Sequence, residues 1–349
     1  MTIEYPDYYE KFRCIGGACP DTCCAGWEVD IDEETAAYYL EQEGPFGERL
    51  RCHMRPEADE DRDMSGGTAD TAEGRKDSGE DGEQGSGWYF PLTSDGRCPF
   101  LNRENLCDIY TALGEESLCQ VCTEYPRYFA GAGDYQQIDM SLSCMELGRI
   151  FFSEKDRIHY YLSENDADGE DIAPEDRERL DDIIGQRCDW IELLQGEDGP
   201  LEEKLSRILT EGFFGESDET LLRVMGSQEV LDHRWEEILQ RVRENLPALK
   251  AWKPAEALPQ DTAADYERWF TKLSVYFLFR YAIDAFADGG MEPELRLLAR
   301  SLRMIHLMCA ERAVRTGTFS REDMIDIAHI YSRQTEHSLE NVELVKNLS

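Results

Sequence analysis

The cysteines of this chain are gathered towards its N-terminal end. Ten of the twelve precede residue 150, at positions Cys14, Cys19, Cys23, Cys24, Cys52, Cys98, Cys107, Cys119, Cys122 and Cys144. In a reducing compartment, closely spaced cysteines are more often metal ligands than disulfide partners. Thiolates are soft ligands that select zinc, copper(I) or iron–sulfur clusters. The sequence therefore predicts a thiolate-bound metal site in the first 150 residues.

The adjacent pair Cys23 and Cys24 indicates what kind of site this is. Neighbouring side chains leave the backbone in different directions, so they rarely both bind one tetrahedral ion. A cluster, or two neighbouring sites, accommodates the pair more easily than one zinc ion does. A structural zinc site and a disulfide framework remain as alternatives, and the second requires export. His53 is a weaker candidate for a mixed ligand set, and Cys188 and Cys309 are interpreted as small buried hydrophobic residues.

The charge of the chain bears on its partners. There are 36 basic and 74 acidic residues, a formal net charge of −38. Such a chain repels phosphate backbones and anionic lipids, which argues against nucleic-acid and membrane partners. The longest apolar run, residues 273–279, is too short to span a bilayer. Residues 1–11 lack the apolar segment of an export signal, which predicts a cytoplasmic protein.

Two acidic stretches divide the chain. Residues 56–87 contain no aromatic and no β-branched aliphatic residue, and such a segment cannot bury enough apolar surface to offset its ordering entropy. We therefore expect a disordered acidic insertion there, inside a cysteine-rich domain of residues 1–150. The second stretch, residues 163–182, marks the boundary to a helical domain of residues 170–349.

The apolar pattern predicts a mainly α protein. In the N-terminal domain, Asp32 followed by Glu33 and Glu34 indicates the start of one helix. Beyond the boundary, apolar residues recur at helical spacing over residues 180–194, 201–214, 230–246, 266–286, 295–314 and 321–345. Strand signals are few, and no G-x-G-x-x-G fingerprint is present. We expect a loop-rich, cysteine-rich metal-binding N-terminal domain packed on an α-helical C-terminal bundle.

Seven short blocks follow one another in a recognisable order. Six are in the cysteine-rich part: Phe12-Arg13-Cys14, the stretch from Cys19 through Cys23-Cys24 to Gly26-Trp27, Cys98-Pro99-Phe100-Leu101, Leu106-Cys107-Asp108-Ile109-Tyr110, the stretch from Cys122 to Tyr125-Pro126-Arg127, and Leu142-Ser143-Cys144. The seventh runs from Tyr331 through Arg333 and His337 to Asn341. Together they resemble the flagellin lysine N-methylase family, within a wider group of zinc- or iron-chelating proteins with the signature C-x-x-x-C-x-x-C-C. The spacings before Cys23-Cys24 are one residue wider here, and Cys119 stands where no family cysteine is expected.

The resemblance implies an enzyme, a protein-lysine N-methyltransferase. Its methyl donor would be S-adenosylmethionine, and its substrate would be lysine side chains of flagellin. It further implies an iron–sulfur cluster, of the 4Fe-4S type, bound by cysteines of the blocks. The candidate metal ligands are Cys14, Cys19, Cys23, Cys24, Cys98, Cys107, Cys122 and Cys144. Since one cluster typically needs four thiolates, either two metal sites exist or some of the eight have another role.

Methyl transfer requires a neutral lysine amine at the moment of attack. It also requires a binding surface, such as aromatic faces, that suits both the sulfonium group of the methyl donor and the approaching lysine. Aromatic residues within or beside the blocks could form it: Trp27, Tyr110, Tyr125 and Tyr128. Arg333, His337 and Asn341 recur every four residues on one helix face. From these sets, Tyr110, Tyr125, Arg333 and His337 are the catalytic candidates, although ordinary aromatic packing and an exposed polar face explain the same patterns.

A function of another class also fits the sequence. The chain could be a cytoplasmic metal-chelating or redox-sensing binding protein with a structural zinc site. The missing nucleotide-binding fingerprint favours this alternative, whereas the presence of both the cysteine blocks and the C-terminal block favours the enzyme.

Overall fold

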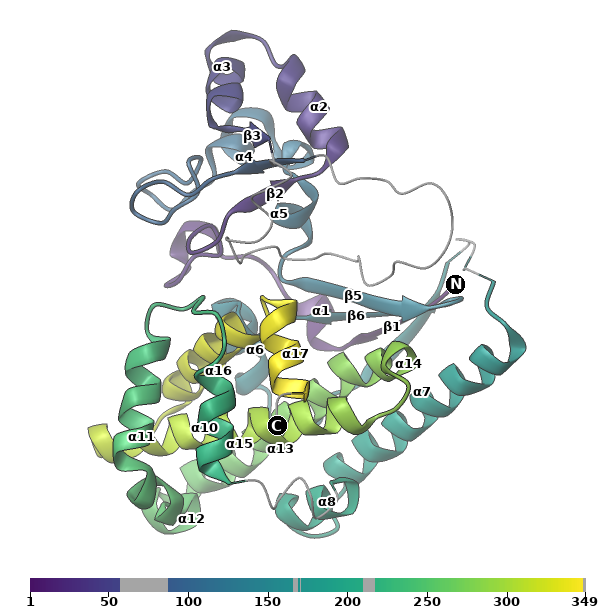
Figure 1. Cartoon of the computed structure of the whole chain (residues 1–349), viewed down its shortest axis with the longest axis vertical. Coiled ribbons are helices and arrows are strands. Elements are labelled where there is room, and N and C mark those ends of the chain that lie inside the picture. Colours follow the sequence, from purple (N-terminus) through teal and green to yellow (C-terminus); the bar gives the residue numbers. More distant parts are fainter. Residues whose placement is uncertain (57–86, 166–168, 170, 210–216, 348–349) are drawn as a thin grey trace.

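The computed structural model describes residues 1–56, 87–165, 169, 171–209 and 217–347. They form a small upper part and a larger lower body (Figure 1). The predicted insertion at residues 56–87 lies almost wholly outside the described residues. No helix in the described ranges is both long and apolar enough to cross a membrane.

The small part is a three-stranded antiparallel sheet with short helices around it. Strands β2 (Val29–Ile31), β4 (Trp88–Phe90) and β3 (Arg55–Pro56) lie in that order. Helices α2 (Glu33–Glu41), α3 (Gly44–His53), α4 (Asp108–Leu113) and α5 (Gln120–Glu124) surround them. Its core is built on large buried side chains such as Tyr39, Leu50 and Phe100. The predicted helix start is confirmed, because the Asp32 carboxylate accepts a hydrogen bond from the Thr35 amide.

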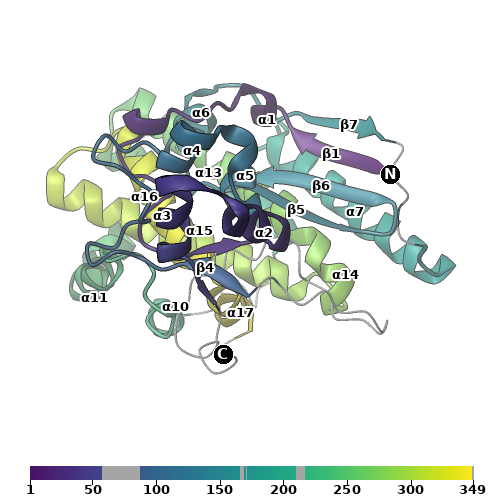
Figure 2. The ribbon, with the colours of Figure 1, turned by 90° about the horizontal axis from the view of Figure 1, so that it is seen from above.

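The body contains a four-stranded mixed sheet that the sequence pattern did not indicate. Its order is β5 (Arg127–Ala132), β6 (Tyr135–Met140), β1 (Thr2–Pro6) and β7 (Tyr160–Glu164), and Figure 2 shows these strands side by side. Strand β1 pairs parallel to β6 and antiparallel to β7. The sheet was missed because its strands are short and β1 pairs with a partner far along the chain. Short helices α1 (Tyr8–Lys11) and α6 (Met145–Ser153) follow β1 and β6.

The rest of the body is helical, as predicted. Its longer helices are α7 (Pro174–Gln195), α8 (Leu201–Ile208), α10 (Asp218–Met225), α11 (Trp235–Ala251), α13 (Gln260–Tyr281), α15 (Glu292–Thr316), α16 (Arg321–Thr335) and α17 (Leu339–Asn347), with short α12 (Pro254–Ala257) and α14 (Ala285–Asp288) between them. The single helix expected over 321–345 is two helices, separated where Glu336 forms a buried ion pair with Arg280. The end of the helix expected over 201–214 falls outside the described residues, and α10 was not predicted.

One large core joins the two ends of the chain. Tyr8 and Phe12 after β1, and Leu147 and Phe151 on α6, belong to the same buried cluster as the C-terminal helices. Helix α6 packs directly against α16. This buried cluster therefore contains residues from both sides of the stretch 163–182. Of the two cysteines interpreted as buried hydrophobic residues, Cys309 is buried as expected, but Cys188 is exposed on α7, so its interpretation was wrong.

The ends of the 57–86 segment lie side by side. Pro56 and Trp88 are paired on antiparallel neighbours β3 and β4, and paired residues in such strands are only about 5 Å apart at Cα. Replacing residues 57–86 by a short Asn-Gly turn should therefore leave the melting temperature and metal content of the protein unchanged, because loop-closure entropy varies slowly with length. Thermal unfolding and elemental analysis measure both. Loss of metal from the shortened protein would show that the segment contributes to the site.

A buried carboxyl group in the body makes stability depend on pH. Glu294 on α15 is buried near Lys346, and burial raises the pKa of Glu294 to about 8 although Lys346 opposes the shift. The folded chain then holds a proton that the unfolded chain releases near pH 4.5. The free energy of unfolding should fall as pH rises between these values, by up to about 1.4 kcal/mol per pH unit. Urea unfolding across this range should show the slope in the parent and in the exposed control Glu292→Gln, but not in Glu294→Gln.

Candidate functional site

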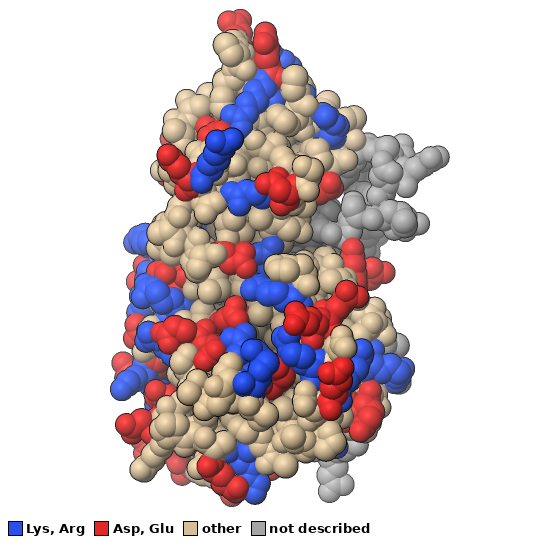
Figure 3. All heavy atoms as spheres, turned by 90° about the vertical axis from the view of Figure 1, so that its left-hand side faces the viewer, with Lys and Arg blue, Asp and Glu red and all other residues tan. Residues whose placement is uncertain are grey.

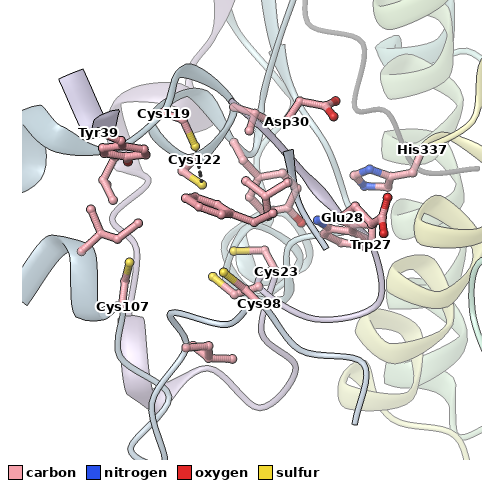
Figure 4. Close-up of a pocket in the computed structure, with 18 residues that line it drawn as sticks. Cys23, Trp27, Glu28, Asp30, Tyr39, Cys98, Cys107, Cys119, Cys122 and His337 are labelled. Carbon is pink, nitrogen blue, oxygen red and sulfur yellow. Dashed lines mark hydrogen bonds between the residues drawn. The ribbon is translucent and has the colours of Figure 1, made fainter. Parts of the chain in front are cut away.

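Six cysteines line one cavity between the small part and the body. The cavity has a volume of about 80 Å³, and its thiols are Cys23, Cys24, Cys98, Cys107, Cys119 and Cys122 (Figure 4). The rest of its wall is mainly apolar, with Phe90, Leu101 and Ile109 among the residues. Five of the eight predicted ligands therefore meet at one place, together with Cys119, which was not expected to take part.

Backbone pairing brings these thiols together from distant segments. Ala25 and Arg97 form an isolated antiparallel bridge, and the Cys98 amide donates to the Cys24 carbonyl at 2.8 Å. Cys107 and Cys119 occupy the positions just before α4 and α5. The segments before and after residues 57–86 are thus held against each other by main-chain hydrogen bonds.

The thiols of the cavity differ in their protonation. Burial raises the pKa of Cys98 to about 12 and also raises that of Cys107. The hydrogen bond from Cys23 lowers the pKa of Cys24 to about 7 despite burial. The sulfurs of Cys119 and Cys122 lie 3.3 Å apart, and Figure 4 shows this contact. Burial disfavours the charged form of these thiols. The positive charge of a bound metal would offset this effect and stabilise them as thiolates.

The arrangement of the donors is that of thiols around a cavity rather than around one point. In the part of the chain that the structure describes, no three Cys, His, Asp or Glu side chains converge closely enough to hold one metal ion. Zinc needs its ligands about 2.0–2.3 Å from one point. An iron–sulfur cluster instead separates its cysteine sulfurs by the width of its own core. Six thiols line one cavity, and four thiolates are the usual ligand set of an iron–sulfur cluster and of a structural zinc ion alike.

Three predicted ligands do not line the cavity. Cys14 is exposed, and Cys19 and Cys144 are partly buried. Cys144 lies just before α6 in the body, and Cys14 and Cys19 flank a short turn at Gly16–Ala18. Cys52 is exposed at the end of α3 and contributes nothing to the cavity.

Three of the four catalytic candidates come together at one side of the cavity. Tyr125 and His337 line it, and Trp27 stacks on His337 with ring centres 4.8 Å apart. The Arg333 guanidinium lies 4.3 Å from the centre of the Trp27 ring. Tyr110 is 51% exposed on α4 and does not line the cavity, so the structure does not bring it to the other three.

His337 is held in a hydroxyl network. Burial, with the charges of Arg280 and Arg333, lowers the pKa of His337 to about 3, so the ring is neutral. Its Nε2 lies 2.6 Å from the Ser143 hydroxyl, which also contacts the Tyr125 hydroxyl at 2.9 Å. A neutral imidazole with so low a pKa is a weak base. His337 is therefore better suited to position Tyr125 and Trp27 than to remove protons.

Asp21 is the main residue that sequence reasoning missed. It lies between Cys19 and Cys23, and its carboxylate contacts His329 Nε2 at 2.9 Å and Arg333 Nη1 at 3.3 Å. Although burial raises its pKa, His329 and the neighbouring arginines lower the pKa of Asp21 to about 2. The cysteine loop is therefore anchored to α16 by charge. An acidic residue inside the cysteine motif was visible, but His329 and Arg333 are more than 300 positions away from it.

His329 and Arg333 on α16 also contact main-chain carbonyls next to cysteines. His329 Nδ1 lies 2.6 Å from the Ser143 carbonyl. The ring therefore bridges the Ser143 carbonyl and the Asp21 carboxylate. Arg333 also donates to the Ala25 carbonyl. A Cβ on Gly26, which has φ +98°, would overlap the Arg333 guanidinium, so a glycine is needed there.

The comparison with known families addresses the C-terminal half. Residues 171–349, just over half of the chain, match the model of the FliB lysine N-methylase C-terminal domain. The chain belongs to the FliB lysine N-methylase family. The family region contains His329, Arg333 and His337, whereas the cysteines of the cavity precede it. The predicted family membership is thus confirmed.

Curated relatives agree with this assignment. The chain is 26% identical over 157 residues, 45% of its length, to the flagellar biosynthetic protein FliU of Salmonella muenchen, covering 80% of that protein. Identity is also 26% over 157 residues to the lysine-N-methylases of Salmonella typhimurium and Salmonella choleraesuis. The chain spans 34% of the length of each of these two enzymes. No solved structure matches it.

Proposed function

We propose that this FliB-family chain transfers methyl groups from S-adenosylmethionine to lysine side chains of flagellin, with an iron–sulfur cluster in its cysteine cavity. The observation that carries the proposal is that Tyr125 and His337 line the same cavity as six thiols. The family supports lysine methylation, and flagellin is the substrate class that the names of the relatives suggest. S-adenosylmethionine and reduced thiolates both suit a cytoplasmic protein.

Cys24, Cys98, Cys107 and Cys122 would hold the cluster. They come from separate loops that main-chain hydrogen bonds and short helices keep in place. The loops should therefore lose little conformational entropy when the cluster binds. When bound, the cluster would supply a polarisable, electron-accepting centre at the cavity. The 4Fe-4S type is the one that the family resemblance implies, and four thiolates suit a cluster of this type.

The apolar wall would prepare the lysine for attack. Methyl transfer forms a bond from the lysine nitrogen to the methyl carbon and breaks the bond from that carbon to sulfur, whose electron pair stays on sulfur. The attacking amine must first be neutral, and a desolvating wall lowers the pKa of a lysine. Glu28 and Asp30 also line the cavity. Their carboxylates would attract the cationic groups, and Glu28, whose pKa burial raises, would accept the released proton.

The direct test uses anaerobically purified protein with methyl-labelled S-adenosylmethionine and flagellin. We expect labelled methyl groups on flagellin lysines, identified by mass spectrometry. The same preparation should be brown and contain iron and acid-labile sulfide. Protein that carries its full complement of cluster yet transfers no label to flagellin would contradict the assignment.

A pair of tyrosine variants tests the cavity wall. Tyr125→Phe removes the hydroxyl that contacts Ser143, whereas Tyr110→Phe alters an exposed ring away from the cavity. One lost hydrogen bond should lower the methyl-transfer rate of Tyr125→Phe by about tenfold. Tyr110→Phe should match the parent, and the metal content of both variants should be unchanged. Equal methyl-transfer rates in the two variants would show that the Tyr125 hydroxyl does not contribute to the reaction.

One observation favours the alternative function. The sulfurs of Cys119 and Cys122 lie 3.3 Å apart, so an oxidant could join them in a disulfide. A redox-sensing or metal-chelating binding protein would contain zinc or a reversible dithiol and transfer no methyl group. Zinc analysis and thiol titration on the preparation described above separate this function from the enzyme.

A further inference from the structure

The Ser143 hydroxyl lies at the centre of a buried hydrogen-bond network. Ser143 is 2% exposed and belongs to the turn between β6 and α6. Its hydroxyl oxygen lies 2.6 Å from Nε2 of His337 and 2.9 Å from the Tyr125 hydroxyl. The Ser141 hydroxyl is a further neighbour, at 2.8 Å. Ser143 therefore connects two residues that line the cavity, His337 and Tyr125.

Main-chain contacts hold the turn that carries Ser143. The Ser141 amide donates to the Pro126 carbonyl at 2.7 Å, and the Cys144 amide donates to the Ser141 carbonyl at 3.1 Å. On the other side, Nδ1 of His329 lies 2.6 Å from the Ser143 carbonyl. The backbone from which the hydroxyl projects is thus held without any ligand in the cavity, which is the support that a functional site needs.

The chemistry of these groups determines the direction of the hydrogen bonds. A hydroxyl both donates and accepts, whereas each nitrogen of a neutral histidine ring does only one of the two. Burial and the charge of Arg280 lower the pKa of His337 to about 3, so its ring is neutral. A phenol donates better than an aliphatic hydroxyl because it ionises more readily, and an unprotonated ring nitrogen accepts better than a hydroxyl oxygen. The favoured order is therefore that Tyr125 donates to Ser143, which donates to Nε2 of His337.

This order determines what Tyr125 offers to the cavity. Its proton is directed at Ser143, so the lone pairs of its oxygen remain for a group in the cavity. A neutral lysine amine has two N–H donors and one lone pair, and the lone pair must reach the methyl carbon. A hydroxyl that donated to the amine would hold this lone pair and block the attack. A hydroxyl that accepts holds an N–H instead and leaves the lone pair aimed at the methyl group.

We propose that Ser143 is a positioning residue that directs the Tyr125 hydroxyl to accept a hydrogen bond from the amine of the lysine substrate. The inference rests on the proposed function, since it concerns the amine of that substrate. Figure 4 shows Glu28 on the same side of the cavity as Trp27 and His337. As the nitrogen–carbon bond forms and the carbon–sulfur bond breaks, the electron pair stays on sulfur and the proton of the amine passes to Glu28. Tyr125 would thus orient the amine while Glu28 accepts its proton.

A double-mutant cycle on methyl transfer tests this role. Ser143→Ala removes the acceptor of the Tyr125 proton, so we expect kcat to fall about tenfold with little change in KM for flagellin. The double variant Tyr125→Phe/Ser143→Ala should lose no more than either single variant, because both changes remove the same interaction. Losses that multiply to about a hundredfold would show that Ser143 does not act through Tyr125 and would overturn the proposal.

Two further serine variants serve as controls. Ser332→Ala removes a hydroxyl that lies 3.1 Å from that of Ser141 and leaves the contacts of Ser143 with the cavity residues in place. Its methyl-transfer rate should equal that of the parent. Ser143→Thr keeps the hydroxyl and should recover most of the rate that Ser143→Ala loses. Equal losses in Ser143→Thr and Ser143→Ala, with both variants folded, would overturn the role of the hydroxyl.

The protonation of the His337 ring is a measurement independent of methyl transfer. In protein with isotope-labelled histidine, the ring nitrogen chemical shifts show which nitrogen carries the hydrogen, and His337→Gln identifies the signal among the six histidines. We expect the parent to carry it on Nδ1 and Ser143→Ala to lose this preference. A hydrogen on Nε2 in the parent would reverse the network and overturn the proposal. If the hydrogen is on Nδ1 but the parent transfers no methyl group, the proposed function fails, and the assignment of the amine fails with it, while the order of the network stands.

Discussion

Cys24→Ser is expected to lose the cluster of the cavity and to stop methylating flagellin. A serine hydroxyl is a hard ligand that does not replace a soft thiolate. Even changes behind the ligands of a metal site lower affinity about 10–100-fold, so loss of a ligand should exceed that. Cys24 is central among the cavity thiols, because it acts electrostatically on Cys98, Cys107 and Cys122.

Two measurements on this variant are needed together. Iron content reports the cluster, and transfer of labelled methyl to flagellin reports the activity. Cys188→Ser, which changes an exposed thiol on α7, is the matched control and should equal the parent in both. If Cys24→Ser lacks the cluster but methylates flagellin at the parental rate, the cluster has no part in the reaction.

Gly26→Ala is expected to detach the cysteine loop from the body. Its φ of +98° alone costs a non-glycine residue about 1–3 kcal/mol. The added Cβ would also displace the Arg333 guanidinium, which donates to Ala25 and pairs with Asp21. Losing charge-assisted hydrogen bonds adds about 1.5–3 kcal/mol. The free energy of unfolding should fall by about 2.5–6 kcal/mol in total, and the metal content should fall with it.

Gly114→Ala is a closely matched control for this variant. Gly114 has φ +99°, and no atom lies within 4 Å of the position that its Cβ would occupy. It therefore carries the same kind of backbone penalty without the clash. Denaturant unfolding of both variants isolates the contribution of Arg333. Equal losses of stability would mean that Arg333 moves aside freely and does not anchor the loop.

The charge of the protein illustrates a limit of composition. The net charge of −38 predicts repulsion of anionic partners. On the face shown in Figure 3, however, lysine and arginine residues are interspersed with aspartate and glutamate. Many of these groups form ion pairs across the body, such as Arg303 with Asp218 and Arg312 with Asp326. Composition counts charges, but the fold determines which of them neutralise one another.

Helix positions and individual caps were predictable because they depend on neighbours along the chain. The apolar period located α7, α13 and α15, and Asp32 marked the start of α2. The sheet of the body was not predictable in this way. Its strands are at most six residues long, and β1 pairs with β6, which follows the whole small part in the sequence. Pairing between such distant segments leaves no local periodic signal.

The sequence by itself determined the set of chemical groups: a cysteine-rich half, a helical half, and blocks that resemble the flagellin lysine N-methylases. Spacing could not assign each thiol to a site, and it left out Cys119 and Asp21. Only the tertiary structure brought Tyr125 and His337 to one cavity wall with six of the thiols. The physical reason is that ligand sets and charge networks depend on distances in space, which non-local strand pairing and the packing of α6 on α16 decide.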